Sequence, residues 1–280
     1  MKHNAFLLFY DDNCPLCVWY TNLFVKYDLL APENRIPFST ADEQTLSRID
    51  LIRATNEIPL LDLANNKTYY GVDALLTILK QRFPSLSFVE RSKPLSWFFR
   101  KLYALISYNR KVVVAKKCGD GQYDCSPSFN IRYRMLFIFT ILACCIGCIP
   151  IIHQSLLLKL PGIELSVSAL MAGLFIPILL TYGISFALPA RQRFDWIGQH
   201  AMLGLLSILS LVPSLLIATF LSTEPWLLFI SMACAAMFVS KEYIRRISFV
   251  LAFKRFPVLI AFNIGGALFF LAYLFLNTAL

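Results

Sequence analysis

The stretch that decides the fold is residues 5–17, AFLLFYDDNCPLC. Its apolar first half has the character of a buried strand, and a short polar turn leads from it into an apolar helical pattern. Cys14 then falls at the start of a helix, where unpaired backbone N–H groups and the helix dipole favour a thiolate. Cys17 falls on the same helical face, one turn deeper. The stretch therefore predicts a strand, a turn and a helix that carry a dithiol redox site.

The two cysteines have different expected roles. Cys14 is the candidate nucleophile, and Cys17 is the candidate resolving thiol that attacks a mixed disulfide formed at Cys14. Pro15 suits the first helical turn, where no N–H partner is needed. The same spacing is also half of a zinc site, and cysteines often serve as small buried hydrophobic residues. The rest of the chain has to decide between these interpretations.

A second element pattern follows downstream. Residues 58–63 (IPLLDL) and 68–71 (TYYG) predict two strands joined by a polar turn, and residues 72–83 predict a closing helix. Thioredoxin-like folds use a proline at the start of such a strand to present backbone to a substrate sulfur. We expect Pro59 to have this role, next to Ile58, and to be preceded by a cis peptide bond. The predicted N-terminal fold is therefore α/β and thioredoxin-like.

The segment resembles a known family, the DCC thiol-disulfide oxidoreductase-like proteins, whose motif is Tyr-Asp-Gly-x-Cys-x-x-Cys. The residues at the positions of this motif are Tyr10, Asp11, Asp12, Asn13, Cys14 and Cys17. The similarity extends to residues 107–110 (SYNR), which resemble the family's terminal aromatic and Asn-Arg signature. The resemblance implies thiol–disulfide exchange at the two cysteines.

Two aspartates precede the cysteines. Asp12 stands where the family usually has Gly, which affects the turn and adds a charge that opposes a thiolate. Asp11 could accept the proton of Cys17 during resolution. Alternatively, Asp11 and Asp12 simply cap the helix.

The second half of the chain indicates a membrane protein. The chain is 58% hydrophobic and 15% charged, with a mean hydropathy of +0.62, which is too apolar for an ordinary soluble protein. Five apolar runs in series predict an all-α transmembrane bundle. They cover residues 133–152, 167–188, 200–221, 225–239 and 257–276, of which the fourth is short. The expected domains are a redox domain at 1–110, a basic linker at 111–132 and a transmembrane domain at 133–280.

Basic residues predict the orientation. They gather before the first span and in the second and fourth links, so we expect a cytoplasmic N-terminal domain and an outside C-terminus, in the inner or plasma membrane if the protein is bacterial. We expect no signal peptide before the first strand. The net charge of +9 comes largely from these loops and does not support nucleic-acid binding. The basic, aromatic segment 93–117 is predicted to be a terminal helix packed on the domain or a headgroup-level segment.

The other six cysteines leave alternatives open. In the linker, Cys118 and Cys125 could form a redox relay with Cys14 and Cys17, complete a four-thiolate zinc site, or be inert. Cysteines within the predicted spans could pass reducing equivalents across the membrane, as in transporters of the cytochrome-biogenesis kind, or could serve as small apolar residues. Those candidates are Cys144, Cys145, Cys148 and Cys234. Cys144 and Cys234 fall near the expected bilayer midplane and could face each other.

The predicted function is that of a membrane-anchored thiol-disulfide oxidoreductase. Its expected partners are a protein or small-molecule thiol or disulfide and the lipid bilayer; no bound cofactor is required, and a quinone has no specific support. The oligomeric state is not predicted. One alternative is a redox-inert binding module on a membrane scaffold, which burial of both thiols would favour. A transporter is a third hypothesis, with Gln199 and Asn263 as thin support.

Overall fold

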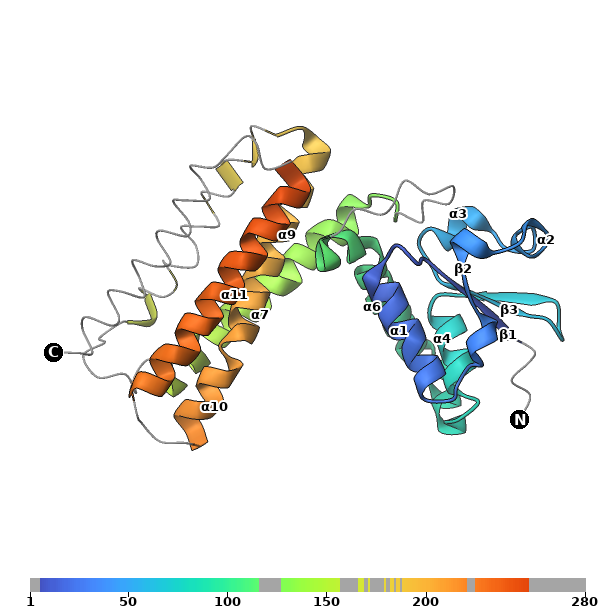
Figure 1. Cartoon of the computed structure of the whole chain (residues 1–280), viewed down its shortest axis with the longest axis horizontal. Helices are drawn as coiled ribbons and strands as arrows, with labels where there is room; N and C mark the ends of the chain where they lie inside the picture. Colours follow the sequence, from blue (N-terminus) through green and yellow to red (C-terminus); the bar gives the residue numbers. More distant parts are fainter. Residues whose placement is uncertain are drawn as a thin grey trace. The chain divides into compact units, whose positions relative to one another are not determined.

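The computed structural model describes residues 6–115, 127–156, 190–220 and 225–251, together with isolated residues between 166 and 189 (Figure 1). The chain divides into two compact units, Met1–Arg134 and Met135–Leu280. Each unit is described by itself.

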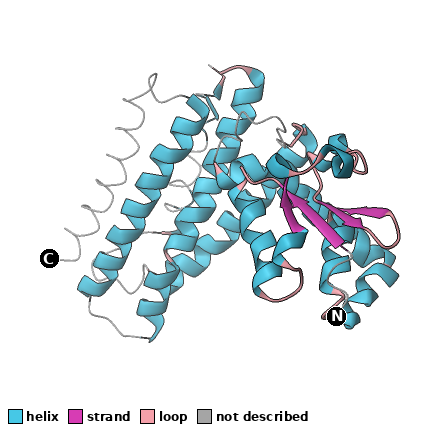
Figure 2. Ribbon diagram, turned by 45° about the vertical axis from the view of Figure 1, so that its right-hand side comes forward, coloured by secondary structure: helices cyan, strands magenta, loops and turns pink. Residues whose placement is uncertain are grey.

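The first unit is built on a four-stranded mixed sheet of order β2-β1-β3-β4 (Figure 2). The central strand β1 (Phe6–Tyr10) pairs in parallel with β2 (Arg35–Pro37) and antiparallel with β3 (Pro59–Asp62). The edge strand β4 (Lys67–Tyr70) pairs antiparallel with β3. The parallel pair requires a crossover, and α1 (Pro15–Lys26) supplies it.

Helices complete this unit. After β2 come the short helices α2 (Glu43–Leu46) and α3 (Leu51–Ala54). After the β3–β4 hairpin come α4 (Val72–Leu79), α5 (Ser87–Arg91) and the long α6 (Lys93–Val114). Short 3₁₀ turns lie at Pro32–Asn34, Phe38–Thr40 and Pro84–Leu86.

Both faces of the sheet are covered, which explains why β1 is apolar throughout. Leu8 and Tyr10 belong to one core cluster, with Phe24 of α1 and Ile78 of α4. Phe9 belongs to a second cluster, with Phe38, Leu46 and Leu61 among its members. Each fully buried side chain of this size contributes about 1.5–3 kcal/mol through removal of apolar surface from water. The predicted thioredoxin-like α/β fold is confirmed.

The expectation of a cis peptide bond at Pro59 is wrong. The described residues contain no cis peptide bond. Before Pro59, the Ile58 N–H donates to the Tyr103 hydroxyl at 2.9 Å, and the Ile58 carbonyl accepts from the Gly71 N–H at 2.9 Å. Pro59 then continues the ladder opposite Tyr70. A trans bond fits this regular strand entry.

The second unit is helical. Its described elements are α7 (Ile131–Ser155, which begins in the first unit), α9 (Ala190–Ser210), α10 (Val212–Phe220) and α11 (Pro225–Leu251). Among the described residues, three helical segments are long and apolar enough to cross a membrane: Ile131–Ser155, Gln192–Phe220 and Trp226–Val250. They overlap the first, third and fourth predicted spans. The predicted span at 167–188 is described only at isolated residues, and that at 257–276 lies outside the described residues.

Helix α11 is longer than the predicted run 225–239. It continues through a charged stretch, where Glu242 pairs with Arg245 at 2.7 Å and with Arg246 at 3.2 Å. Arg246 also donates to the Gln199 side chain of α9 at 2.7 Å. The charges of this stretch are therefore paired, and the helix runs on to Leu251.

Candidate functional site

Cys14 occupies the first position of helix α1. It is the N-cap residue, with extended backbone (φ −95°, ψ 107°), and Pro15 follows in the first turn. The Cys14 sulfur accepts a hydrogen bond from the Cys17 backbone N–H at 3.4 Å. A sulfur in this position takes a donor that the helix itself leaves unpaired, and negative charge there is favoured by the helix dipole.

The two thiols have opposite acid–base properties. A hydrogen bond from the Cys17 thiol is the main cause that lowers the pKa of Cys14 to about 6; burial opposes this, while the Cys17 N–H and Arg110 assist it. The same thiol–thiolate hydrogen bond, with burial, raises the pKa of Cys17 well above its ordinary value. At neutral pH Cys14 is then a thiolate and Cys17 holds its proton. This asymmetry supports the predicted roles of nucleophile and resolving thiol.

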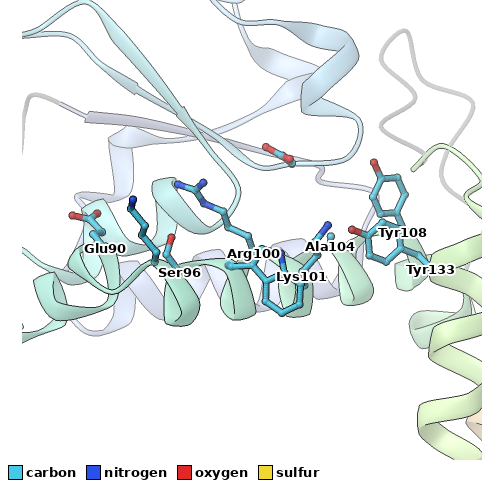
Figure 3. Close-up of a pocket in the computed structure, with 10 residues that line it drawn as sticks. Glu90, Ser96, Arg100, Lys101, Ala104, Tyr108 and Tyr133 are labelled. Carbon is cyan, nitrogen blue, oxygen red and sulfur yellow. The ribbon is translucent and has the colours of Figure 1, made fainter.

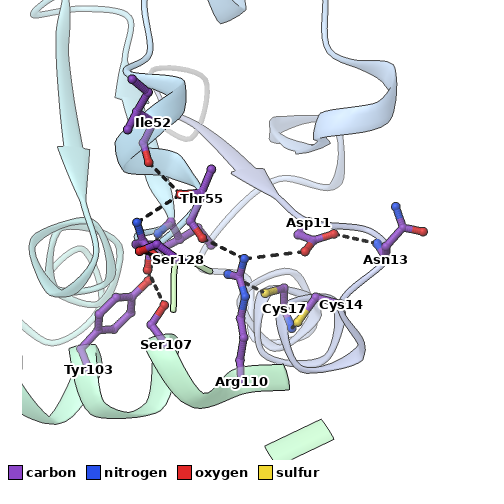
Figure 4. A network of polar contacts seen from close by, with 12 residues as sticks. Asp11, Asn13, Cys14, Cys17, Ile52, Thr55, Tyr103, Ser107, Arg110 and Ser128 are labelled. Atoms are coloured by element: carbon purple, nitrogen blue, oxygen red, sulfur yellow. Dashed lines mark hydrogen bonds and ion pairs between the residues drawn. The ribbon is translucent and has the colours of Figure 1, made fainter. Parts of the chain in front are cut away.

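Arg110 of α6 brings a positive charge to the dithiol (Figure 4). Its Nη1 lies 3.9 Å from the Cys17 sulfur, and its Nη2 lies 3.8 Å from Asp11 Oδ2 and donates to the Thr55 carbonyl at 3.0 Å. Arg110 is 8% exposed and Asp11 is 5% exposed. A charge this deeply buried is tolerated only when it is paired and hydrogen-bonded. The guanidinium therefore joins α1, α3 and α6 around the sulfurs.

The contact between Arg110 and Cys17 was not anticipated from the sequence. The two residues are 93 positions apart, and the sequence presents Arg110 only as one residue of the SYNR segment. The signal that could have found it is an arginine at the end of an otherwise apolar helical face, where a buried charge needs a partner.

Asp11 and Asp12 form hydrogen bonds in the turn before α1 and do not cap the helix. Asp11 Oδ1 accepts from the Asn13 N–H at 3.0 Å, and its carbonyl accepts from the Cys14 N–H at 3.2 Å. Asp12 is exposed and accepts from the Ser39 hydroxyl at 2.8 Å. The alternative that Asp11 and Asp12 cap α1 is wrong, because Cys14 holds that position. Asp12 is not among the described residues with positive φ, so the turn does not need glycine there.

This geometry agrees with a family comparison. Residues 8–116 match the family model of the DCC1-like thiol-disulfide oxidoreductases. The match covers less than half of the chain and includes Cys14, Cys17, Pro59 and Arg110. No curated protein and no solved structure matches the chain. The resemblance seen in the sequence is confirmed for this domain.

Both thiols of the Cys14–Cys17 pair in the DCC1-like domain are largely covered. Cys14 is 6% exposed and Cys17 is 4% exposed. The low exposure of both thiols, taken alone, favours the alternative that the domain is a redox-inert binding module. The stabilised thiolate and the nearby guanidinium favour exchange chemistry, because a structural buried cysteine has no need of either.

The remaining predicted site residues of this domain and its linker have no described hydrogen bond or ion pair with Cys14 or Cys17. Pro59 is buried at the start of β3, and its role toward a partner stays a prediction. Cys118 and Cys125 lie outside the described residues, so the zinc and linker-relay alternatives are untested there. Among the described residues, no group of three or more His, Cys, Asp or Glu side chains could hold a metal ion.

The cysteines of the helical unit have different environments. Cys145 is buried in α7, with its sulfur near Gly204 of α9. Cys148 is half-buried, while Cys144 and Cys234 are exposed. All six described cysteines are free thiols. Their part in a relay stays a prediction.

A polar groove of about 650 Å³ runs along α6 (Figure 3). Two of its charged side chains form ion pairs: Arg100 pairs with Asp73 at 3.0 Å, and Glu90 pairs with Lys80 at 2.6 Å. Tyr108 and Tyr133 stack at its end, with ring centroids 4.8 Å apart. No cysteine lines this groove. Since α6 also carries Arg110 into the core, the terminal-helix alternative for this segment is confirmed.

Proposed function

We propose that the DCC1-like domain exchanges disulfides with a partner, using Cys14 and Cys17, while apolar helices hold it at a membrane. The observation that carries this proposal is a thiolate-stabilising N-cap at Cys14 next to a protonated Cys17. A nucleophile that is ionised near neutral pH, with a second thiol one turn away, is the equipment that exchange requires.

The chemistry balances within the dithiol. The Cys14 thiolate attacks one sulfur of a partner disulfide; the partner S–S bond breaks, and the other sulfur leaves as a thiolate and takes up a proton. Cys17 then loses its proton and attacks the Cys14 sulfur, which releases the second partner thiol. Two electrons pass to the partner, and a Cys14–Cys17 disulfide remains. The reverse sequence oxidises a partner dithiol.

Three polar groups assist these steps. Arg110 stabilises the Cys14 thiolate through its charge. As Cys17 ionises, the Arg110 guanidinium at 3.9 Å favours the developing thiolate. Asp11 is the proposed acceptor of the Cys17 proton, because its carboxylate and the Cys17 sulfur contact the same guanidinium, at 3.8 Å and 3.9 Å. Ile58 and Pro59 are proposed to hold the partner's backbone.

The membrane part of the proposal follows the charge distribution. The basic segments support a DCC1-like domain in the cytoplasm and a C-terminus outside. A relay to the membrane thiols is an extension of the same proposal, and neither a quinone nor a metal is required for the exchange itself.

The test is to trap the mixed disulfide in the full chain. Cys17→Ala should accumulate a covalent adduct with a disulfide-bridged peptide, and mass spectrometry should place it on Cys14. Cys14→Ala should form no adduct at this site, which controls for the other cysteines. Failure of Cys17→Ala to form an adduct at Cys14 would contradict the proposal.

The burial of both thiols favours a second candidate, the redox-inert binding module. In that case Cys14 and Cys17 should resist alkylation in the folded protein over hours. Rapid alkylation of Cys14 with slow alkylation of Cys17 would exclude this candidate.

A further inference from the structure

A second, apolar pocket lies beside the dithiol. It has a volume of about 230 Å³ and opens between α1, α4 and α6. Its apolar wall consists of Leu16, Tyr20, Leu75, Tyr103 and Ile106. Cys17 and Arg110 also line it. The pocket thus places an apolar surface next to the resolving thiol.

Three polar side chains of this wall are already bonded to the protein. The Tyr103 hydroxyl accepts from the Ile58 N–H at 2.9 Å, and the Ser107 hydroxyl donates to the Asn56 carbonyl. Burial raises the pKa of Tyr103, so this phenol stays neutral. Arg110 is engaged with Thr55 and Asp11. An occupant therefore meets mainly aliphatic and aromatic carbon, and an apolar group suits the pocket best.

The size of the pocket favours a single side chain. Pockets for drug-sized ligands or cofactors are about 300–1,000 Å³, and this one is smaller. Single apolar or aromatic anchors buried in such pockets dominate many protein interfaces. A whole soluble cofactor is therefore a poorer fit than one residue of a bound peptide.

The position of the pocket relates it to the partner's cysteine. Cys17 and Tyr20 follow Cys14 along α1, so the pocket wall lies about 5–9 Å from Cys14 along the helix axis. An extended peptide covers that distance in about two or three residues. A chain joined to Cys14 through a disulfide therefore brings a residue near its own cysteine to the pocket mouth.

We propose that this pocket binds an apolar side chain of the partner, two or three residues from the cysteine that bonds Cys14. This rests on the proposed function and assigns it a substrate class: a protein or peptide disulfide with an apolar flanking residue. The side chain positions the partner disulfide for attack by the Cys14 thiolate, and the bonds made and broken are those of the exchange above.

The test compares two disulfide-bridged peptides that differ only in the flanking residues, Leu or Ser, two and three positions from the cysteine. The reduced full chain, freed of reductant, is mixed with each peptide, and the rate of thiol release is followed by mass spectrometry. We expect the Leu peptide to react about tenfold faster, since burial of one such side chain is worth about 1.5–3 kcal/mol and about 1.4 kcal/mol corresponds to tenfold.

Two variants of α6 test whether the pocket causes the difference in rate between the Leu and Ser peptides. Ile106 is 44% exposed at the pocket, and Ile106→Ser should bring the Leu-to-Ser rate ratio close to one. Leu102, one turn away and 39% exposed, does not line the pocket, and Leu102→Ser should leave the ratio unchanged. Equal rates for both peptides in the unmodified protein would overturn the pocket assignment while exchange stands. No reaction with either peptide would overturn the exchange proposal and this one together.

Discussion

At the scale of single residues, the site depends on one buried charge near two sulfurs. The Arg110 guanidinium lies 3.9 Å from the Cys17 sulfur and 3.8 Å from the Asp11 carboxylate, and all three residues are more than nine-tenths buried. Its charge favours the Cys14 thiolate, and Asp11 opposes that thiolate. These two residues therefore adjust the reactivity of the dithiol, beside the larger effect of the Cys17 thiol hydrogen bond, and contribute to the domain's stability.

Removal of Arg110 should damage both properties. Arg110→Met should raise the pKa of Cys14 from about 6 and destabilise the domain by about 3–5 kcal/mol, because it removes the cation from a buried pair. Alkylation rates against pH and thermal unfolding measure the two effects. The double variant Arg110→Met/Asp11→Asn should recover part of the stability, and no recovery would argue against the ion pair.

Replacement of Asp11 should separate attack from resolution. Asp11→Asn removes a charge that raises the pKa of Cys14, so that pKa should fall and attack should not slow. Resolution should slow on the order of 10²-fold, because the proposed proton acceptor is lost. Stopped-flow quench with mass spectrometry should show accumulation of the mixed disulfide. The exposed neighbour provides the control, since Asp12→Asn should change neither step.

The lowered pKa of Cys14 also links stability to pH. A group whose pKa is depressed by folding adds stability that is complete above its unfolded pKa of about 8.5 and is lost as pH falls through about 6. The reduced domain should therefore become more stable from pH 6 to 8.5; above that range the raised pKa of Cys17 acts in the opposite direction. Thermal unfolding across this range should show the rise, and Cys14→Ser should remove most of it.

At the scale of elements, local patterns predicted local structure. The apolar run of β1 and the Cys-Pro start of α1 are short-range signals, and both were predicted from residues 5–17. Contacts between distant parts of the chain were not predicted, because they depend on partners far away in the sequence. Ile58 bonds to Tyr103, and the site charge comes from Arg110. In α11, Arg246 likewise bonds to Gln199 of another helix.

The junction of β4 and α4 offers a test at this scale. Gly71 has φ 58°, and an added Cβ would lie 3.2 Å from the Tyr103 ring. Gly71→Ala should therefore destabilise the domain by about 1–3 kcal/mol through backbone strain and should disturb the Tyr103 side of the apolar pocket. Thermal unfolding measures the change. Gly147→Ala in α7, where no atom lies within 4 Å of the added Cβ, should have little effect.

At the scale of the whole molecule, a domain that matches the DCC1-like thiol-disulfide oxidoreductase family precedes helices suited to a bilayer. The basic segments support a cytoplasmic domain, where thiols are kept reduced. In that compartment Cys14 and Cys17 would be kept as thiols instead of a disulfide, so Cys14 would be available as the nucleophile.

Orientation is the prediction that belongs to this scale. With epitopes at both ends of the chain expressed in bacteria, external protease on spheroplasts should remove the C-terminal epitope and spare the N-terminal one. Lysed spheroplasts, in which both should be removed, provide the control. Loss of the N-terminal epitope from intact spheroplasts would reverse the proposed topology.

The most direct test of the central claim is the ionisation of Cys14 in the full chain. Alkylation by iodoacetamide, followed for each cysteine by peptide mass spectrometry from pH 4 to 10, should show Cys14 reacting with a midpoint near pH 6 and well before Cys17. A Cys14 midpoint at or above the ordinary thiol value of about 8.5, or equal rates for the two cysteines, would contradict the account.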